Sequence, residues 1–276
     1  MNRLFNLLIL TLLAFPLMSF AKGKILATPG VSQVEGSGGG GLVPWAQLAG
    51  YATEDELAFS AFCTQANVKD FQLNTCGAQA NFYDRVEVSI AKQNFDVDPL
   101  FLTLSQKIVG LKVRLYGDLV YSTWPQLSMG LQYKSLDTPT TAYALGAKDD
   151  KGTDLYLAAS KLHLGLVAGY NFLWNASLRY TKANEMGLLG FGGPNGNGSI
   201  QTELSAAILL NKHIAVGTEY RYKPDNLGLN EDNWQDIFIA WFPNKQINVT
   251  LAYLDLGAIA AIPNQTGWYL SLSGSY

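Results

Sequence analysis

Hydrophobic and polar residues alternate with a period of two through many segments of this chain, which is the pattern of β-strands. The last stretch, residues 267–276, is an example. Trp268, Leu270, Leu272 and Tyr276 share one face, while Tyr269 and the serines at 271, 273 and 275 share the other. The alternation predicts a strand with one oily face and one polar face.

The same pattern predicts strands elsewhere. Residues 200–210 and 214–222 form a predicted hairpin, and further strands are expected at 109–116, 127–134, 174–180 and 247–253. A soluble sandwich could not cover so many oily faces. A closed barrel in lipid turns them to hydrocarbon, turns the polar faces to a wet lumen and leaves no edge unpaired. We therefore expect an all-β protein, a transmembrane antiparallel up-and-down β-barrel.

The predicted connections alternate between short and long, as in outer-membrane barrels, where periplasmic turns are short and outer loops are longer. The short ones are 81–85, 122–125, 211–213 and 242–245, and the long ones are 137–152, 182–198 and 223–232. Counting back from a periplasmic C-terminus gives about twelve strands that start at Leu57, an even number as such barrels require. Strands at 24–35 and 42–54 would make about fourteen, an alternative that stays open.

The N-terminus predicts export. Arg3 precedes an apolar run that ends in small residues at Ser19 and Ala21, as in a cleaved signal peptide. A membrane anchor is the alternative, but Pro16 argues against it. The expected organisation is a signal peptide at 1–21 and a glycine-rich segment at 22–56, placed in the lumen, in the periplasm or as first strands. The barrel follows at 57–276, in the bacterial outer membrane.

Composition excludes other classes. The chain is 48% hydrophobic and 15% charged, and after the N-terminus it has no apolar run long enough for a membrane helix. A polytopic helical membrane protein is thereby excluded. The net charge of −3 gives no reason to expect nucleic acid as a partner.

The chain has two cysteines, Cys63 and Cys76, placed symmetrically about a predicted hairpin tip at 69–70. In an exported protein this predicts a cross-strand disulfide. Strict alternation places Cys63 with oily residues but Cys76 with polar Gln72 and Asn74, so we expect a bulge, or a hairpin tip that stands clear of the membrane.

Several motifs spread over most of the chain that follows the signal peptide carry a family resemblance. They are GGGLVPWAQLAGY, YDRVEVSIAKQ, GLKVRLYGD, QYKS, GAKDD, DLYLAASK, TKANEMGLLGFGG, EYRYKPDNLG, AWFPNK and LAYLDLG. Together they resemble the domain of unknown function 3034 family of proteobacterial outer-membrane proteins. The resemblance implies an outer-membrane barrel and no particular activity.

The sequence gives little support for a catalytic site or a metal site. The two histidines, His163 and His213, fall near predicted periplasmic turns with no serine placed beside them by sequence, so no enzyme activity is expected. Asp149, Asp150 and Asp154 crowd one predicted loop, where a solvated charged loop is favoured over a divalent-cation site. We expect no metal and no cofactor.

Charges on the predicted inner faces are the best functional candidates, because they would either tune selectivity in a pore or pair across a closed lumen. They are Glu87, Lys112, Arg114, Lys134, Arg179, Glu203, Glu219 and Arg221.

We predict a small-solute channel or porin-like transporter; the alternative is a non-conducting structural or surface-binding barrel that acts through its outer loops. The expected partners are outer-membrane lipid, lipopolysaccharide, an unknown small solute and the barrel assembly machinery. That machinery would read Trp268, Leu270, Leu272 and Tyr276 as an assembly signal.

Overall fold

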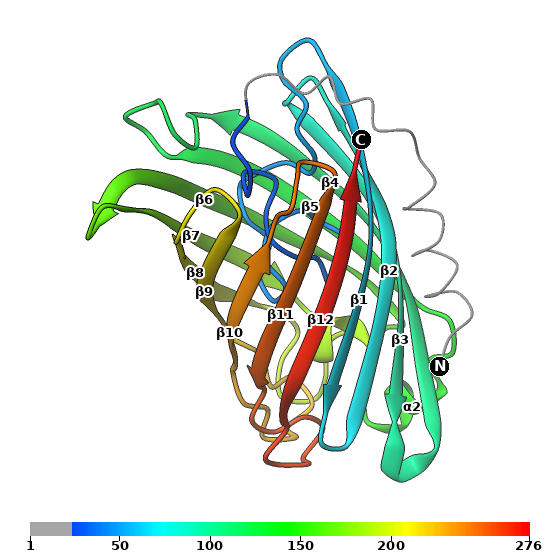
Figure 1. Cartoon of the computed structure of the whole chain (residues 1–276). Coiled ribbons are helices and arrows are strands. Elements are labelled where there is room, and N and C mark those ends of the chain that lie inside the picture. The colour runs from blue at the N-terminus through cyan, green and yellow to red at the C-terminus, as the bar shows by residue number, and fades with distance from the viewer. Residues whose placement is uncertain (1–23) are drawn as a thin grey trace.

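The computed structural model describes residues 24–276, which form one closed antiparallel barrel of twelve strands (Figure 1). The predicted signal peptide lies outside the described residues. The strands are β1 (Leu57–Val68), β2 (Phe71–Phe82), β3 (Val86–Val97), β4 (Leu102–Tyr116), β5 (Gln126–Leu136), β6 (Lys151–Val167), β7 (Tyr170–Thr181), β8 (Ser199–Leu209), β9 (Ile214–Arg221), β10 (Trp234–Trp241), β11 (Ile247–Asp255) and β12 (Thr266–Ser275).

Each strand pairs with its neighbours in the sequence, and β1 pairs with β12 to close the barrel. At the seam, Phe59 and Tyr276 exchange backbone hydrogen bonds of 2.8 and 2.7 Å. The prediction of twelve strands from Leu57 is confirmed. The alternative of fourteen is wrong, because residues 24–54 make isolated bridges and no strand of the barrel.

The two ends of the barrel differ. One end, here called the turn end, carries Tyr276 and connections such as 83–85, 168–169 and 210–213. The other, the loop end, carries the long connections 137–150, 182–198 and 222–233. Helical elements are short: η1 (Asp98–Leu100), α2 (Thr140–Ala144) and η2 (Glu185–Gly187). Within residues 24–276, no helix is long and apolar enough to cross a membrane.

Alternation along the strands builds an apolar outer surface. In β5, for example, Met129 and Tyr133 are exposed, whereas Ser128 and Gln132 are fully buried inside. Tyrosine and tryptophan side chains ring the outer surface near both ends, as amphipathic residues do at the two interfaces of a membrane. Those towards the turn end are Tyr83, Tyr116, Tyr121, Trp124, Tyr170, Trp241 and Tyr276, and those towards the loop end are Tyr133, Tyr180, Tyr220, Tyr222, Tyr253 and Trp268. Tyr269, on the same face of β12 as the serines, lies inside the barrel and is 1% exposed.

The polarity of the two faces reverses towards the loop end of β1–β4. On β3, Val88 and Ile90 face outward, but further along the same outer face carries Lys92 while Phe95 and Val97 turn inward. A polar outer face and an apolar interior are expected where a strand leaves the membrane for water. These strands therefore extend beyond the lipid.

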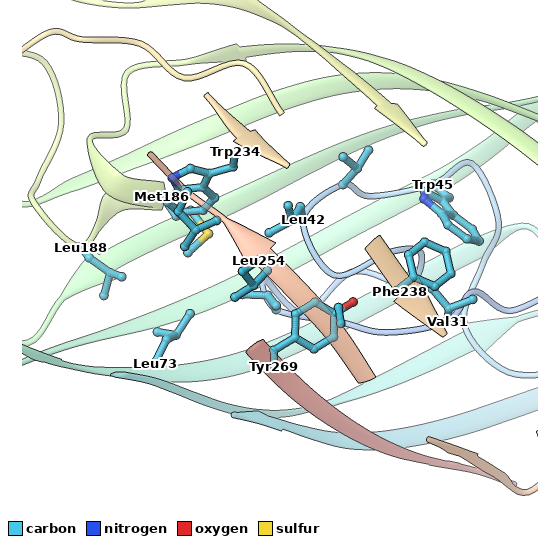
Figure 2. Packing of buried hydrophobic residues seen from close by; sticks show 14 of the residues in the cluster. Val31, Leu42, Trp45, Leu73, Met186, Leu188, Trp234, Phe238, Leu254 and Tyr269 are labelled. Carbon is cyan, nitrogen blue, oxygen red and sulfur yellow. The ribbon is translucent and has the colours of Figure 1, made fainter. Parts of the chain in front are cut away.

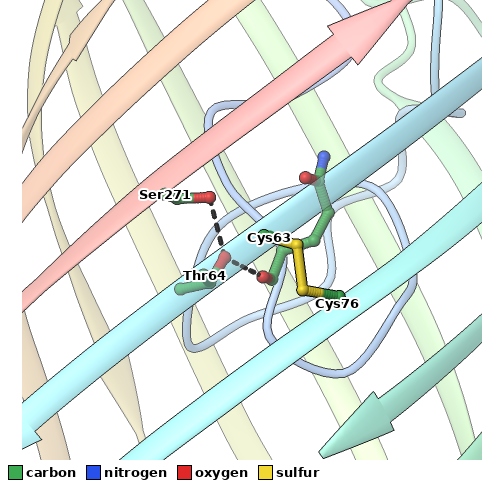
Figure 3. The surroundings of a disulfide bond; sticks show 5 residues. Cys63, Thr64, Cys76 and Ser271 are labelled. Carbon is green, nitrogen blue, oxygen red and sulfur yellow. Dashed lines mark hydrogen bonds between the residues drawn. A yellow bond between two sulfur atoms is a disulfide. The ribbon is translucent and has the colours of Figure 1, made fainter. Parts of the chain in front are cut away.

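This reversal explains the surroundings of the disulfide. Cys63 and Cys76 lie directly opposite each other on β1 and β2, and their sulfurs are bonded (Figure 3). The predicted disulfide is confirmed. The β1–β2 pairing runs through this position without a register shift, so no bulge is needed. Gln72 and Asn74 share the outer face with Cys76 because this part of β2 stands at the water-exposed end.

The interior of the barrel is filled by its own chain. Residues 27–52 of the N-terminal segment are all buried, and so are residues 183–193 of the β7–β8 loop. Because most lipid-facing side chains count as exposed in the isolated protein, this burial places both stretches inside the wall. Figure 1 shows the N-terminal segment, in blue, looped inside the barrel. We call residues 24–56 the inner segment.

Apolar side chains of the inner segment pack against the wall. In Figure 2, Leu42 and Trp45 lie near Phe238, Leu254 and Tyr269 of strands β10–β12. At the loop end, Met186 and Leu188 of the β7–β8 loop join the same buried cluster. The barrel thus has a continuous core made from three parts of the chain.

Candidate functional site

The inner segment is bound most strongly at Glu35, whose carboxylate meets cations from three different strands. Arg221 Nη1 and Arg179 Nη2 lie 2.6 and 3.1 Å from Glu35 Oε2, and Lys134 Nζ contacts Oε1. All these groups are at least nine-tenths buried. Such charge-assisted contacts to a carboxylate are among the strongest hydrogen bonds in proteins. We call Lys134, Arg179 and Arg221 the cation cradle.

Two wall carboxylates complete the cluster. Asp154 lies 2.7 Å from Lys134 and 3.2 Å from Arg179, and Glu203 lies 2.7 Å from Arg179. The wall alone therefore places three cations against two carboxylates, an excess of one positive charge that Glu35 neutralises. Burial would raise the pKa of Glu35, but the surrounding cations hold it well below its usual range. The inner segment thus contributes a permanent anion.

A second attachment, nearer the turn end, holds both arms of the inner segment. Glu87 accepts hydrogen bonds from Gly38 N at 3.1 Å and from Ala49 N at 2.7 Å. Lys112 donates to the carbonyls of Gly38 and Gln47, each at 2.7 Å. Glu87 and Lys112 also form an ion pair of 3.5 Å. One pair of wall charges thereby ties together two stretches of the segment that lie apart in sequence.

Glu219 forms the third attachment, at the glycine-rich bend. It accepts hydrogen bonds from Leu42 N at 2.8 Å and from Trp45 Nε1 at 3.2 Å. A side chain at Gly40 would overlap the Glu219 carboxylate, and one at Gly41 would overlap the Tyr269 ring. The glycine run is therefore required for close approach of this backbone to the wall.

The inner segment enters at the turn end, where ion pairs fix its start. Lys24 lies 2.6 Å from Asp84, which also pairs with Arg114. The segment also leaves at this end, because Glu56 precedes β1 and its carbonyl accepts a hydrogen bond from Tyr83 N at 2.9 Å. Both arms of the segment thus pass through the same mouth.

The β7–β8 loop closes the lumen from the loop end. Gln106 donates to Met186 O at 3.2 Å, and Lys223 lies 2.5 Å from Glu185 and 2.9 Å from Glu231. Burial and the neighbouring Glu185 raise the pKa of Glu231 to about 9, although Lys223 opposes the shift. Lys223 therefore joins the β7–β8 loop to the β9–β10 connection.

A small cavity of about 10 Å³ separates this loop cluster from the cation cradle. Its lining includes Arg179, Glu203 and Arg221 on one side and Glu185, Met186 and Lys223 on the other. The cradle is therefore covered by the β7–β8 loop on one side and by the inner segment on the other.

The charged residues proposed from sequence all lie inside the barrel or at its turn-end mouth. Glu87 and Lys112 hold the two arms, Glu219 holds the bend, and Lys134, Arg179, Glu203 and Arg221 gather around Glu35. Arg114 lies at the turn-end mouth. Their proposed role in solute selectivity stays a prediction. Trp268, Leu270 and Leu272, which we predict to be part of an assembly signal, face outward on β12. That role stays a prediction.

Sequence reasoning missed Glu35 and Asp154. Glu35 ends the stretch 24–35, which the sequence offered only as an additional strand, and no signal in the sequence marked it as a functional residue. Asp154 was grouped with Asp149 and Asp150 as part of a charged loop, but it lies on β6 and is 0% exposed. Its alternation with Leu155 could have placed it on the inner face.

The histidines have structural partners. Trp174 Nε1 donates to His163 Nε2 at 3.1 Å, and His213 Nδ1 lies 2.6 Å from Phe242 O. Among the described residues, no group of three or more histidine, cysteine, aspartate or glutamate side chains is placed to hold a metal ion.

A closed even-numbered barrel with an apolar belt, two aromatic rings and a polar lumen defines a porin-like β-barrel of the outer-membrane class. The chain belongs to the family described as protein of unknown function (DUF3034), whose model matches residues 28–273. The match includes most of the inner segment as well as the barrel. No curated protein matches the chain.

Solved structures with a similar fold include outer-membrane proteins. Outer membrane protein Omp33 of Acinetobacter baumannii is 8% identical, with a TM-score of 0.48 over 81% of this chain and 100% of that chain. NanC porin is 8% identical, with a TM-score of 0.49 over 79% and 98%. KdgM porin is 10% identical, with a TM-score of 0.46 over 79% and 99%. At such identities the likeness concerns the fold alone.

Proposed function

We propose that this protein is a channel for a small solute and that its inner segment is the gate. The observation that carries the proposal is the burial of residues 27–52 inside a barrel whose wall charges hold them at three attachments. A wall of charges and polar side chains remains when the segment moves, and it would be wet.

The topology supports reversible opening. Because both arms of the inner segment pass through the turn-end mouth, the segment can leave as a folded-back loop without threading an end through the barrel. No hydrogen bond between barrel strands has to break. The cost is the exposure of apolar residues such as Trp45 and the loss of the ion pairs at Glu35.

The proposed setting follows from the class of barrel. Residues 1–21 would direct export and be removed, the turn end would face the periplasm, and the apolar belt would contact outer-membrane lipid. Lipopolysaccharide would surround the loop end, and the assembly machinery would read the C-terminal strand. The proposal assigns no catalytic activity.

A reversible tether tests the gate. Ser128 Oγ donates to Ala46 O at 2.5 Å, so A46C and S128C place two thiols at the contact between segment and wall. The pair is introduced in a C63S/C76S background, so that the tether is the only disulfide. In planar bilayers we expect discrete current steps from the reduced protein and their loss on oxidation. Equal currents in both states would overturn the gating proposal.

The rival hypothesis is a non-conducting barrel that acts through its loops. It is supported by the same burial, because residues 27–52 and 183–193 fill the lumen. The two hypotheses differ when the segment is loosened. If folded protein gives no current steps even with E35Q or the reduced tether, the barrel does not conduct and the rival is supported.

A further inference from the structure

We propose that the cation cradle is a binding site for a small monocarboxylate anion, and that such an anion opens the channel by competing with Glu35. The inference rests on the proposed function for its gating part only. The binding part stands on the geometry of Lys134, Arg179 and Arg221.

The resident group shows which chemistry the site accepts. Arg221 contacts both oxygens of Glu35, with Nη1 2.6 Å from Oε2 and Nη2 3.3 Å from Oε1. Arg179 makes a further contact to Oε2, and Lys134 makes one to Oε1. The planar fork of arginine matches the two oxygens of a carboxylate. Cations from three strands thus converge on a carboxylate group that belongs to a separable part of the chain.

The wall charges select a monoanion. Asp154 and Glu203 already occupy part of the cradle, so the wall carries three cations against two carboxylates. One added negative charge neutralises the cluster. A second negative charge on the same ligand would lie near Asp154 or Glu203, and no cradle cation would be left to balance it. Gln132 supplies polar contacts beside the anion, since it accepts from Arg179 at 2.9 Å and donates to Glu35 O at 3.2 Å.

An external anion would approach the cradle from the loop end, once the β7–β8 loop moves. The small cavity between the β7–β8 loop and the cradle already reaches Arg179, Glu203 and Arg221. At Gly187, the loop backbone passes so close to Gln106 and Lys134 that a side chain there would contact both. Movement of the β7–β8 loop away from Gln106 and Lys134 would therefore open the cradle without disturbing the inner segment.

Competition with Glu35 sets the concentration scale. A group tethered to the same chain acts at an effective concentration on the order of millimolar. To displace Glu35, a simple anion must therefore exceed this effective concentration about tenfold, which means tens of millimolar. A solute with additional contacts to the polar wall would need less.

Chemical rescue tests the site directly. Truncation by E35A removes Cγ and the carboxylate, and acetate has the size of these missing atoms. The reporter is A46C, whose side chain lies at a position that is 0% exposed, so its alkylation by an aqueous maleimide measures release of the segment. Full-length protein in detergent is compared in acetate, chloride and acetamide at matched ionic strength.

The proposal predicts opposite effects of acetate. In A46C alone, acetate should speed alkylation by about tenfold, a typical coupling between two sites, because it competes with Glu35. In A46C/E35A, acetate should slow alkylation by filling the gap, and adding R221M should abolish this slowing. Uncharged acetamide should change neither rate, and malonate, a dianion, should act no better than acetate.

Equal alkylation rates in acetate and chloride for both proteins would overturn the carboxylate site. The test is independent of conductance. Acetate effects on alkylation in a barrel that never conducts would support the site and refute the channel. Current steps with no acetate effect would support the channel and refute the site.

Discussion

Arg221 Nη1 lies 2.6 Å from Glu35 Oε2, although 186 positions separate the two residues in the chain. The contact joins the inner segment to strand β9, where Arg221 also lies 3.4 Å from Glu203 of the neighbouring strand. Such contacts between the segment and the wall, together with those of the β7–β8 loop, distinguish this barrel from an open pore.

Removing the charge of Glu35 should release the segment and leave the barrel intact. Loss of one partner from a buried ion cluster costs about 3–5 kcal/mol, because the remaining charges are left uncompensated. The E35Q barrel can relieve this penalty by expelling the segment, since its strands stay paired. We expect faster alkylation of A46C and an unchanged heat-modifiable gel shift. A cysteine at exposed Glu54 serves as the control, and its rate should not change.

The glycine run should be intolerant of side chains. A Cβ at Gly40 would overlap the Glu219 carboxylate, which is fixed by Leu42 N, Ser205 and Trp45. G40V should therefore displace the bend and increase alkylation of A46C. E219A removes the group that a side chain at position 40 would overlap. The double variant G40V/E219A should therefore increase alkylation of A46C by less than the sum of the increases in the two single variants. Wild-type rates in G40V would show that the bend has room to move.

The disulfide should add stability without being required for folding. Cys63 and Cys76 are separated by 13 positions, and closing a loop of this length contributes about 2–4 kcal/mol. The C63S/C76S protein should fold into the same heat-modifiable barrel with a lower midpoint of chemical denaturation. Titration of the unreduced, denatured wild-type protein should find no free thiol. A full complement of thiols would contradict the bond.

Alkaline pH should loosen the β7–β8 loop. The pKa of Glu231 is raised to about 9 by burial and Glu185, from an ordinary value of 4.5. The protonated carboxyl is favoured when the loop is in place, so this contribution is complete below pH 4.5 and decreases as pH rises towards 9. Hydrogen exchange of the Leu189 amide measures this loosening. After correction for the pH dependence of intrinsic exchange, its protection factor should fall by at most about tenfold per pH unit. E231Q should remove the dependence, and an identical decline in E231Q would assign it to another group.

Most of the barrel could be predicted because alternation leaves little freedom. Lys112 lies between Leu111 and Val113, so turning these two to lipid sends Lys112 to the lumen, where it is 1% exposed. A charged side chain at mid-bilayer would cost about 2–4 kcal/mol, which makes the opposite register unfavourable. The same pattern gave twelve strands from Leu57 but left fourteen open, and the structure decides for twelve.

The cation cradle could not be predicted in the same way. Alternation places Lys134, Arg179 and Arg221 on the inner face, but whether they meet at one height depends on the stagger of strands around the barrel. That stagger is fixed by the pairing of all twelve strands together. Glu35 adds a further difficulty, since its position depends on a barrel that forms from residues far along the chain.

The last prediction concerns Tyr276, which closes the barrel and ends the proposed assembly signal. Its backbone exchanges hydrogen bonds with Phe59 on β1, and its side chain is 71% exposed on the outside. Deletion of Tyr276 removes both the seam bonds and the ring, whereas Y276D keeps the backbone and loses the ring. If the aromatic ring is read during assembly, both variants should lower the yield of heat-modifiable barrel in outer membranes, and Y276F should restore it. If only the deletion lowers the yield, the seam bonds matter and the ring does not. Normal yields from both variants would remove Tyr276 from the assembly signal altogether.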